Sequence, residues 1–260
     1  MKLTILTENM AGGRFLAEHG ISYLVEIDGE KILFDTGHSD VFLKNAQQLG
    51  INLPAEVNKV VLSHGHWDHG DGLKYTENKT LIAHPSSFIK RFRKSDHSPV
   101  GLTISKEKIQ EKFQLVETKV PYKITENLWF LGEIPRENDF ESQHTSFTDE
   151  FGNDDFIPDD SALAARVQNK LVVITGCSHS GICNIVEYAR KVTGLSTVDT
   201  VLGGFHLKHN DGQTQKTIAY FKKNAIKNIY PSHCTALPAL AGFYQHFEFE
   251  QVKTGMRFEF

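Results

Sequence analysis

The densest group of chemically capable side chains lies at residues 63–72, which read Ser-His-Gly-His-Trp-Asp-His-Gly-Asp-Gly. This stretch contains His64, His66, Asp68 and His69 within six residues. Imidazole nitrogens and a carboxylate are good ligands for zinc, and a mixed set favours a site that keeps a position open for water or substrate. The alternative is a surface turn that happens to be rich in histidine, but the density of ligands argues against it.

The surrounding sequence predicts how this cluster is held. The apolar run Val57–Leu62 is typical of a buried strand, and a helix is predicted from about Asp71. The cluster is therefore expected on a strand-to-helix loop. A loop can aim several imidazoles at one point, whereas a strand would send alternate side chains to opposite faces.

The same pattern recurs later in the chain. Predicted strands at 170–175, 198–202 and 227–230 each run into a polar loop that carries a histidine, namely His179, His206 or His233. Functional groups gather at strand ends in α/β layers, so these loops are expected to converge.

Other segments complete an α/β pattern. Strands at 22–27 and 31–34 flank Asp28-Gly29, which is a hairpin signal. Helices are predicted at 41–49, 182–193 and 214–224, and further strands are predicted at 80–84 and 162–167. Hairpins followed by strand-helix units indicate mixed sheets with helices on their outer faces.

Two charged segments interrupt this alternation of strands and helices. Residues 90–94 place four cations around one phenylalanine, and residues 133–160 hold ten acids against one base, Arg136. The acidic segment predicts a long excursion over the surface that acts either as a lid or as a solvated face. The cationic run and Arg136 are candidate phosphate binders, although such clusters usually face water.

Composition limits the class of protein. The chain has 260 residues, 40% of them hydrophobic, and a net charge of −4, which offers no bulk attraction to nucleic acid. It lacks a long apolar run and has three cysteines, so we expect a cytoplasmic protein with no membrane partner. We expect a small-molecule substrate and no nucleic-acid partner, and self-association is left open.

Taken together, the motifs resemble those of the metallo-β-lactamase superfamily. The His-x-His-x-Asp-His element carries the likeness. Further matches support a branch that resembles 7,8-dihydropterin-6-methyl-4-(β-D-ribofuranosyl)aminobenzene 5'-phosphate synthase-like proteins: Glu18-His19-Gly20, Phe34-Asp35-Thr36-Gly37, Gly132-Glu133-Ile134-Pro135-Arg136, Gly176-Cys177-Ser178-His179, Gly203-Gly204-Phe205-His206-Leu207 and Pro231-Ser232-His233-Cys234-Thr235. The resemblance implies an α/β fold, an αββα sandwich of two mixed β-sheets with helices on the outer faces. We expect a single domain over 1–260, since an αββα fold of this length is commonly one domain, and the charged segments predict a lid or insertion at about 88–160.

The resemblance also implies two divalent metals, with zinc favoured and iron or manganese as alternatives. The metal ligands that it implies are His64, His66, Asp68, His69, His179 and His233. The chain departs from the family pattern near the bridging aspartate, where Cys177 stands instead, and Cys177 is either a thiolate ligand or a small buried turn residue. Asp35 is expected to orient a ligand histidine.

Two residues are assigned catalytic roles. Asp68 would orient the nucleophile and shuttle a proton, and His206 would contact substrate, stabilise developing charge or supply a further ligand nitrogen. His19 is a candidate pocket or metal residue. The expected function is hydrolysis of a small anionic substrate, with a phosphorylated one as an option, by a metal-bound hydroxide. The alternatives are a di-iron redox or oxygen-binding protein, and a phosphodiesterase or synthase of pterin-type metabolism.

Overall fold

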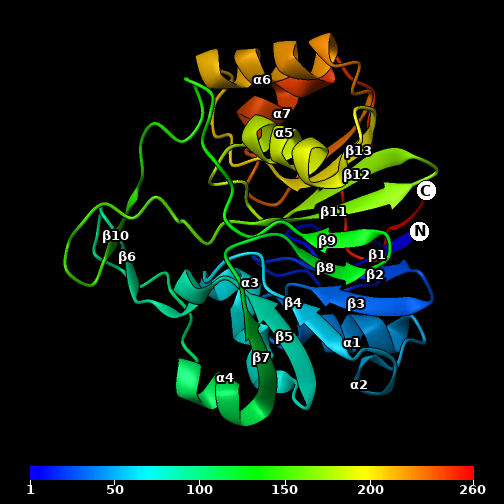
Figure 1. The fold of residues 1–260 in the computed structure, drawn as a ribbon, viewed down its shortest axis with the longest axis vertical. Helices are drawn as coiled ribbons and strands as arrows, with labels where there is room; N and C mark the ends of the chain where they lie inside the picture. Colours follow the sequence, from blue (N-terminus) through cyan, green and yellow to red (C-terminus); the bar gives the residue numbers. More distant parts are fainter. The chain divides into compact units, whose positions relative to one another are not determined.

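The computed structural model describes residues 1–260, which form two compact units. Unit 1 comprises Met1–Lys119, Thr145–Asp159 and Lys253–Phe260, and unit 2 comprises Val120–His144 and Asp160–Val252. Each unit contains one large sheet, and Figure 1 shows the elements of both. The sheets are mixed, as the sequence predicted.

The sheet of unit 1 has seven strands in the order β15-β1-β2-β3-β4-β5-β7. Pairing is antiparallel from β15 to β3 and parallel from β3 to β7. The bounds are β1 Lys2–Thr7, β2 Ser22–Ile27, β3 Glu30–Phe34, β4 Lys59–Val61, β5 Lys79–Ala83, β7 Phe113–Glu117 and β15 Arg257–Glu259. A separate two-stranded sheet pairs β6, Arg91–Arg93, with β10, Phe147–Asp149.

The hairpin predicted around Asp28-Gly29 is confirmed. Strands β2 and β3 pair in register from Ile27 opposite Glu30, with both turn residues at positive φ, 54° for Asp28 and 78° for Gly29. Positive φ at both central residues is the conformation whose twist matches an antiparallel pair, and Asp-Gly adopts it readily.

Unit 1 contains four α-helices, three of which bury apolar residues beside its sheet. They are α1 Val41–Gln48, α2 Leu53–Glu56, α3 Trp67–Gly70 and α4 Lys106–Lys112. Phe42 and Ala46 of α1 and Ile109 of α4 are buried with sheet residues such as Leu33 and Leu81 in one hydrophobic cluster. The helix predicted at 41–49 is therefore confirmed to within one residue.

Unit 2 holds a six-stranded sheet in the order β14-β13-β12-β11-β9-β8. Strands β12, β13 and β14 run parallel, and β12, β11, β9 and β8 pair antiparallel. The bounds are β8 Tyr122–Thr125, β9 Leu128–Phe130, β11 Ala162–Val167, β12 Lys170–Thr175, β13 Val198–Gly204 and β14 Asn228–Ser232.

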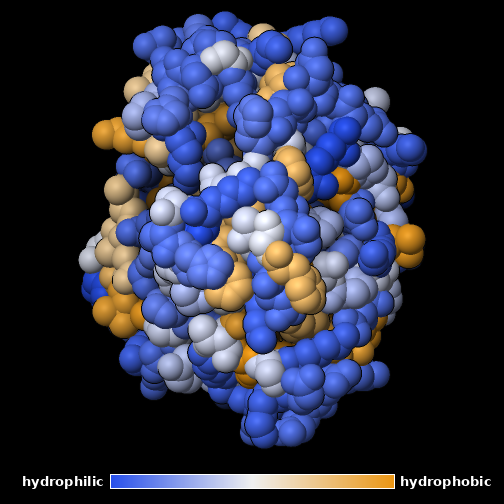
Figure 2. Space-filling view, turned by 90° about the vertical axis from the view of Figure 1, so that its left-hand side faces the viewer, coloured by the Kyte–Doolittle hydropathy of each residue, from blue (hydrophilic) through white to orange (hydrophobic).

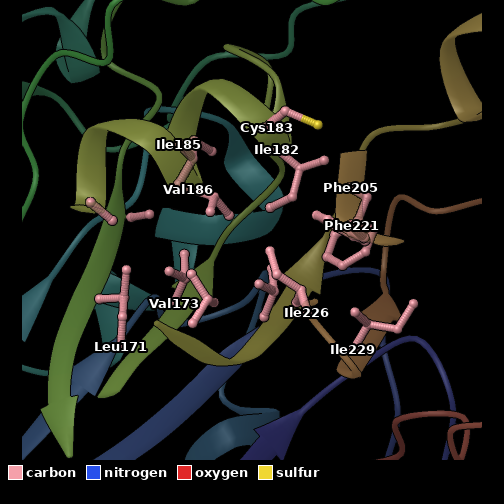
Figure 3. Packing of buried hydrophobic residues seen from close by; sticks show 14 of the residues in the cluster. Leu171, Val173, Ile182, Cys183, Ile185, Val186, Phe205, Phe221, Ile226 and Ile229 are labelled. Carbon is pink, nitrogen blue, oxygen red and sulfur yellow. The ribbon is translucent and has the colours of Figure 1, made fainter. Parts of the chain in front are cut away.

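Three helices pack on one face of this sheet (Figure 1). They are α5 Ile182–Thr193, α6 Gly212–Lys223 and α7 Leu237–Tyr244. Figure 3 shows Ile185 and Val186 of α5 above Val173 of β12, in the same buried cluster as Phe205 and Phe221. This packing fixes the sheet, and therefore the loops at its strand ends.

The acidic segment 133–160 is not a simple surface excursion, so that prediction is wrong in part. Glu141, Asp155, Asp159 and Asp160 are buried, each with hydrogen-bond donors inside its own unit. Burial of a carboxylate is tolerated only where such donors replace water. The segment also divides between the two units. Its role as a lid or insertion stays a prediction, as does the single domain.

The length and polarity of the helices and the hydropathy of the surface are relevant to contact with a membrane. Every helix is too short or too polar for a span across a lipid bilayer. The face of the molecule shown in Figure 2 is mainly hydrophilic, with hydrophobic residues in small separate groups. Scattered exposed apolar residues of this kind are normal for a protein surface.

Glu141 caps helix α5 from a distant part of the chain. The helix begins after Gly181, which offers no side-chain cap, and the Glu141 carboxylate accepts hydrogen bonds from the backbone N–H of Cys183 and Asn184 at 2.9 and 3.0 Å. A carboxylate at a helix N-terminus is also favoured by the helix dipole. Burial nevertheless raises the pKa of Glu141 above its usual value.

We expect Glu141→Ala to lower the free energy of unfolding by about 1–3 kcal/mol, because two buried N–H groups lose their acceptor. Urea denaturation followed by circular dichroism measures the loss. Asp139→Ala, at an exposed position in the same segment, is the matched control and should change stability little. Equal effects of the two substitutions would contradict the capping role.

Candidate metal centre

In unit 1 the histidine cluster lies between β4 and the end of α3. His64 and His66 precede the helix, and Asp68 and His69 fall within its single turn, so the predicted loop is partly helical. His64 and His69 are fully buried, and His66 and Asp68 are 5% and 7% exposed. Polar side chains this deeply buried need specific partners.

The imidazoles face one another. His64 Nε2 lies 3.0 Å from His66 Nδ1, and the rings of His64 and His69 have centroids 4.2 Å apart. Asp68 Oδ2 lies 3.8 Å from His69 Nε2. Three imidazoles and one carboxylate gathered in a buried place are donor types that suit a divalent transition metal, and each of the four belongs to at least one group of possible ligands whose donor atoms lie within 4.8 Å of one another.

Asp35 fixes the orientation of His69. Its buried carboxylate is 2.7 Å from His69 Nδ1, and it also accepts hydrogen bonds from the backbone N–H and the hydroxyl of Ser63, each at 2.7 Å. A carboxylate on Nδ1 favours the tautomer that leaves Nε2 able to bind a metal. The sequence-based expectation that Asp35 orients a histidine agrees with these contacts.

Gly65 is required by the close packing of the cluster. A Cβ atom there would overlap the carbonyl oxygen of Ser87. The Gly65 N–H donates to Asp159 Oδ2 at 2.7 Å. Asp159 is itself held by the buried guanidinium of Arg91, which also donates to Asp155 at 2.7 Å and to the Ser86 carbonyl at 3.0 Å.

Arg91 is therefore a structural cation and not a phosphate binder, which corrects one part of the sequence interpretation. Its side chain is 1% exposed and surrounded by carboxylates. The neighbouring cations are exposed but also paired, Lys90 with Glu150 at 3.4 Å and Lys94 with Asp154 at 2.7 Å. The cations of residues 90–94 thus pair with carboxylates from the part of the acidic segment that belongs to unit 1.

His19 lies at the exposed edge of the cluster. Its Nε2 is 3.3 Å from Asp68 Oδ2, and its side chain is 57% exposed. Its ring also contacts that of Trp67, with centroids 5.6 Å apart. The contact with Asp68 connects the carboxylate to solvent through an imidazole, which is the arrangement needed for a proton relay.

In unit 2 the candidate residues follow the carboxyl ends of three parallel strands. Cys177 and His179 come after β12, His206 after β13, and His233 with Cys234 after β14. The ring centroids of His179 and His206 are 4.2 Å apart. The loops that follow β12, β13 and β14 thus lie close together within this unit, as predicted for them from the sequence.

Cys234 is the residue that sequence reasoning missed, although it directly follows His233 in a motif singled out from the sequence. Its buried thiol belongs to a group with Cys177 and His206 whose ligand atoms all lie within 4.8 Å of one another. Burial acts to raise the pKa of the Cys234 thiol, but hydrogen bonds with Cys177 and His206 and the charge of His233 outweigh it and hold that pKa well below its usual value.

Arg136 lies on the acidic segment of unit 2. Its Nε donates to the Ser142 hydroxyl at 2.8 Å. Burial raises the pKa of Asp160 above its usual value, against hydrogen bonds from Ser180 and the charge of Arg136, which act to lower it. Asp160 accepts from the Ser180 N–H at 2.9 Å, next to His179. Phosphate binding by Arg136 stays a prediction.

Known proteins resemble this chain over its whole length. Residues 18–80 match the metallo-beta-lactamase superfamily. An uncharacterized protein of Methanocaldococcus jannaschii is 38% identical over 94% of each chain. A protein of the same organism named 7,8-dihydropterin-6-methyl-4-(beta-D-ribofuranosyl)-aminobenzene-5'-phosphate synthase is 31% identical over 100% of this chain and 97% of its own. The crystal structure of Tm1679, described as a metal-dependent hydrolase of the beta-lactamase superfamily, has a TM-score of 0.89 at 30% identity and covers 100% of this chain and 99% of that chain.

We expect Arg91→Met to lower the free energy of unfolding by about 3–5 kcal/mol, because two buried carboxylates lose their counter-ion. Urea denaturation measures the loss. Arg93→Met, two residues along at an exposed position, is the control and should have little effect. If both substitutions were equally mild, Arg91 would not be the anchor of this loop.

Proposed function

The chain belongs to the metallo-β-lactamase superfamily, and from this membership we propose that it is a metal-dependent hydrolase of small anionic substrates. The observation that carries the proposal is the buried cluster of His64, His66 and His69 with Asp68, whose orientation is held by Asp35. Binding and orientation of a metal explain why so many polar groups are kept buried in one place.

The proposed centre is dinuclear, with zinc favoured over iron and manganese. We assign His64, His66 and His179 to one metal, and Asp68, His69 and His233 to the other. The assignment rests on the motifs and on the family. When bound, such metals polarise the scissile carbonyl or phosphoryl oxygen and lower the pKa of water.

The protein's own groups then have defined tasks. Asp35 holds the proton of His69 on Nδ1, which keeps Nε2 available as a ligand atom. Asp68 accepts a proton at Oδ2, and His19 Nε2, 3.3 Å away and exposed, passes it to solvent. The remaining assigned residues are His206, as a group that stabilises developing charge, and Arg136, as an anion-binding group.

A second candidate function comes from the synthase-named relative, which is 31% identical over the full chain. The same metal cluster could serve the synthase reaction, in which case hydrolysis of simple esters would be absent. The two candidates differ in substrate and share the metal requirement.

A substrate survey tests the proposed hydrolase. We expect metal-replete protein to hydrolyse at least one class among phosphodiesters, phosphomonoesters, lactones and thioesters, and to lose that activity after chelation. An assay for the product named for the synthase relative runs in parallel. Activity only in the synthase assay would replace the proposal, and hydrolysis that survives complete metal removal would contradict it.

Purified protein should bind at least about two transition-metal ions per chain, because the six donors of the proposed dinuclear centre can form two sets of three. His179→Ala should lose metal with its secondary structure intact. His246→Ala, which alters an exposed histidine of the same unit, should keep the metal content of the native protein. Elemental analysis with circular dichroism makes the comparison, and it also distinguishes iron from zinc. Native stoichiometry in His179→Ala would remove His179 from the ligand set.

Asp68→Asn should lower kcat about 10²–10⁴-fold with a smaller change in KM, because the amide keeps the shape but cannot accept the proton. Steady-state kinetics on the substrate identified by the survey, together with bound metal, separates this from loss of the ion. A variant with native metal content and native kcat would show that Asp68 is not the proton acceptor.

A further inference from the structure

Three potential ligands of unit 2 form a group that the dinuclear assignment does not use. Cys177 and Cys234 form no disulfide and are 4% and 8% exposed, and they lie with His206 so that all three ligand atoms are within 4.8 Å of one another. Each comes from a different strand end, after β12, β13 and β14. Donor atoms around one tetrahedral ion lie about 3.3–3.8 Å apart, because metal–sulfur and metal–nitrogen bonds are about 2.0–2.3 Å long, so shifts of about 1 Å would bring these three atoms around a shared ion.

The backbone is built to bring these residues together. A Cβ atom on Gly204 would lie 2.6 Å from Cys234 Sγ, so only glycine leaves room for the thiol. The Gly204 carbonyl accepts from the hydroxyls of Thr175 and Ser178 at 3.0 and 2.6 Å. These bonds tie the end of β13 to the end of β12.

A second set of bonds ties β13 to β14. The Phe205 N–H donates to the Thr235 hydroxyl at 3.0 Å, and the Ala236 N–H donates to the Leu207 carbonyl at 2.8 Å. Cys177, His206 and Cys234 are therefore presented by three loops that are braced against each other, which is the rigidity that a pre-organised metal site needs.

His206 supplies a further indication of a ligand. Its Nδ1 is buried and has no hydrogen-bond partner. Its backbone is held at a φ of 51°, in the left-handed region that costs a non-glycine residue energy. A buried polar atom left unsatisfied by the protein is one that an ion can satisfy.

We propose that Cys177, His206 and Cys234 form a soft metal site of their own, which binds a thiophilic divalent ion such as Zn²⁺ or Cd²⁺ through two thiolates and one imidazole. Thiolate ligands select such ions over Mg²⁺ and Mn²⁺, and three protein ligands leave a fourth position open. On binding, each thiol releases its proton to solvent and a metal–sulfur bond forms, with no change of oxidation state. The inference concerns metal binding alone and stands whether or not the chain is a hydrolase.

Cadmium titration of the reduced, metal-free full chain tests the proposal. Cadmium–thiolate bonds give a near-ultraviolet charge-transfer absorption that imidazole and carboxylate ligands do not give. We expect this band in the native protein and its loss in Cys177→Ser/Cys234→Ser. Cys183→Ser should keep the band, because Cys183 is buried in the hydrophobic cluster of unit 2 and belongs to no ligand group.

Absence of the band in the reduced native protein, which needs no variant to fold, would overturn the proposal. So would its survival in the double cysteine variant. A His64→Ala/His66→Ala/Asp68→Ala/His69→Ala variant with native circular dichroism decides whether the site is independent. We expect that variant to keep the band at native intensity, and its loss there would show that the thiols bind metal only as an accessory to the histidine cluster.

Discussion

The buried carboxylate of Asp35 is the contact on which the histidine cluster of unit 1 depends. It stands immediately after β3 and receives the N–H and hydroxyl of Ser63 and Nδ1 of His69. One carboxylate therefore joins the end of β3 to the loop after β4 and also sets the His69 ring. The backbone of Asp35 has a φ of 56°, a strained value for a non-glycine residue, and its hydrogen bonds offset that cost.

A second buried charge, the guanidinium of Arg91, also helps to hold the loop after β4. Arg91 neutralises Asp155 and Asp159, and Asp159 receives the Gly65 N–H between the two first histidines of the cluster. A buried ion pair of this kind contributes little net stability, since the cost of removing both charges from water offsets their attraction. Its contribution is to fix one position for the loop, as a metal site requires ligands placed to a fraction of an ångström.

Much of this organisation could be predicted from the sequence because it is local. The apolar residues of β2 and β3 and the Asp28-Gly29 turn between them specify a hairpin, and the strand-end histidines could be predicted from their positions in the sequence alone. The Arg91–Asp159 contact and the capping of α5 by Glu141 could not, because each joins residues more than forty positions apart. A run of cations or acids looks the same in sequence whether it faces water or pairs inside the protein. Cys234 was overlooked for a related reason, since its partners come from two other strand ends.

The loops of unit 2 show how parallel strands concentrate function. Ser178, His206 and His233 follow three adjacent strands, and all three have positive φ, at 64°, 51° and 50°. Left-handed backbone at a non-glycine residue changes the direction of the chain at the strand end. Each such residue costs on the order of 1–3 kcal/mol. The hydrogen bonds among Thr175, Gly204, Phe205 and Thr235, together with the packing of α5 and α7, hold the loops in that conformation. The same kind of turn occurs at every histidine-bearing strand end of this sheet, which supports the proposal that these loops place metal ligands.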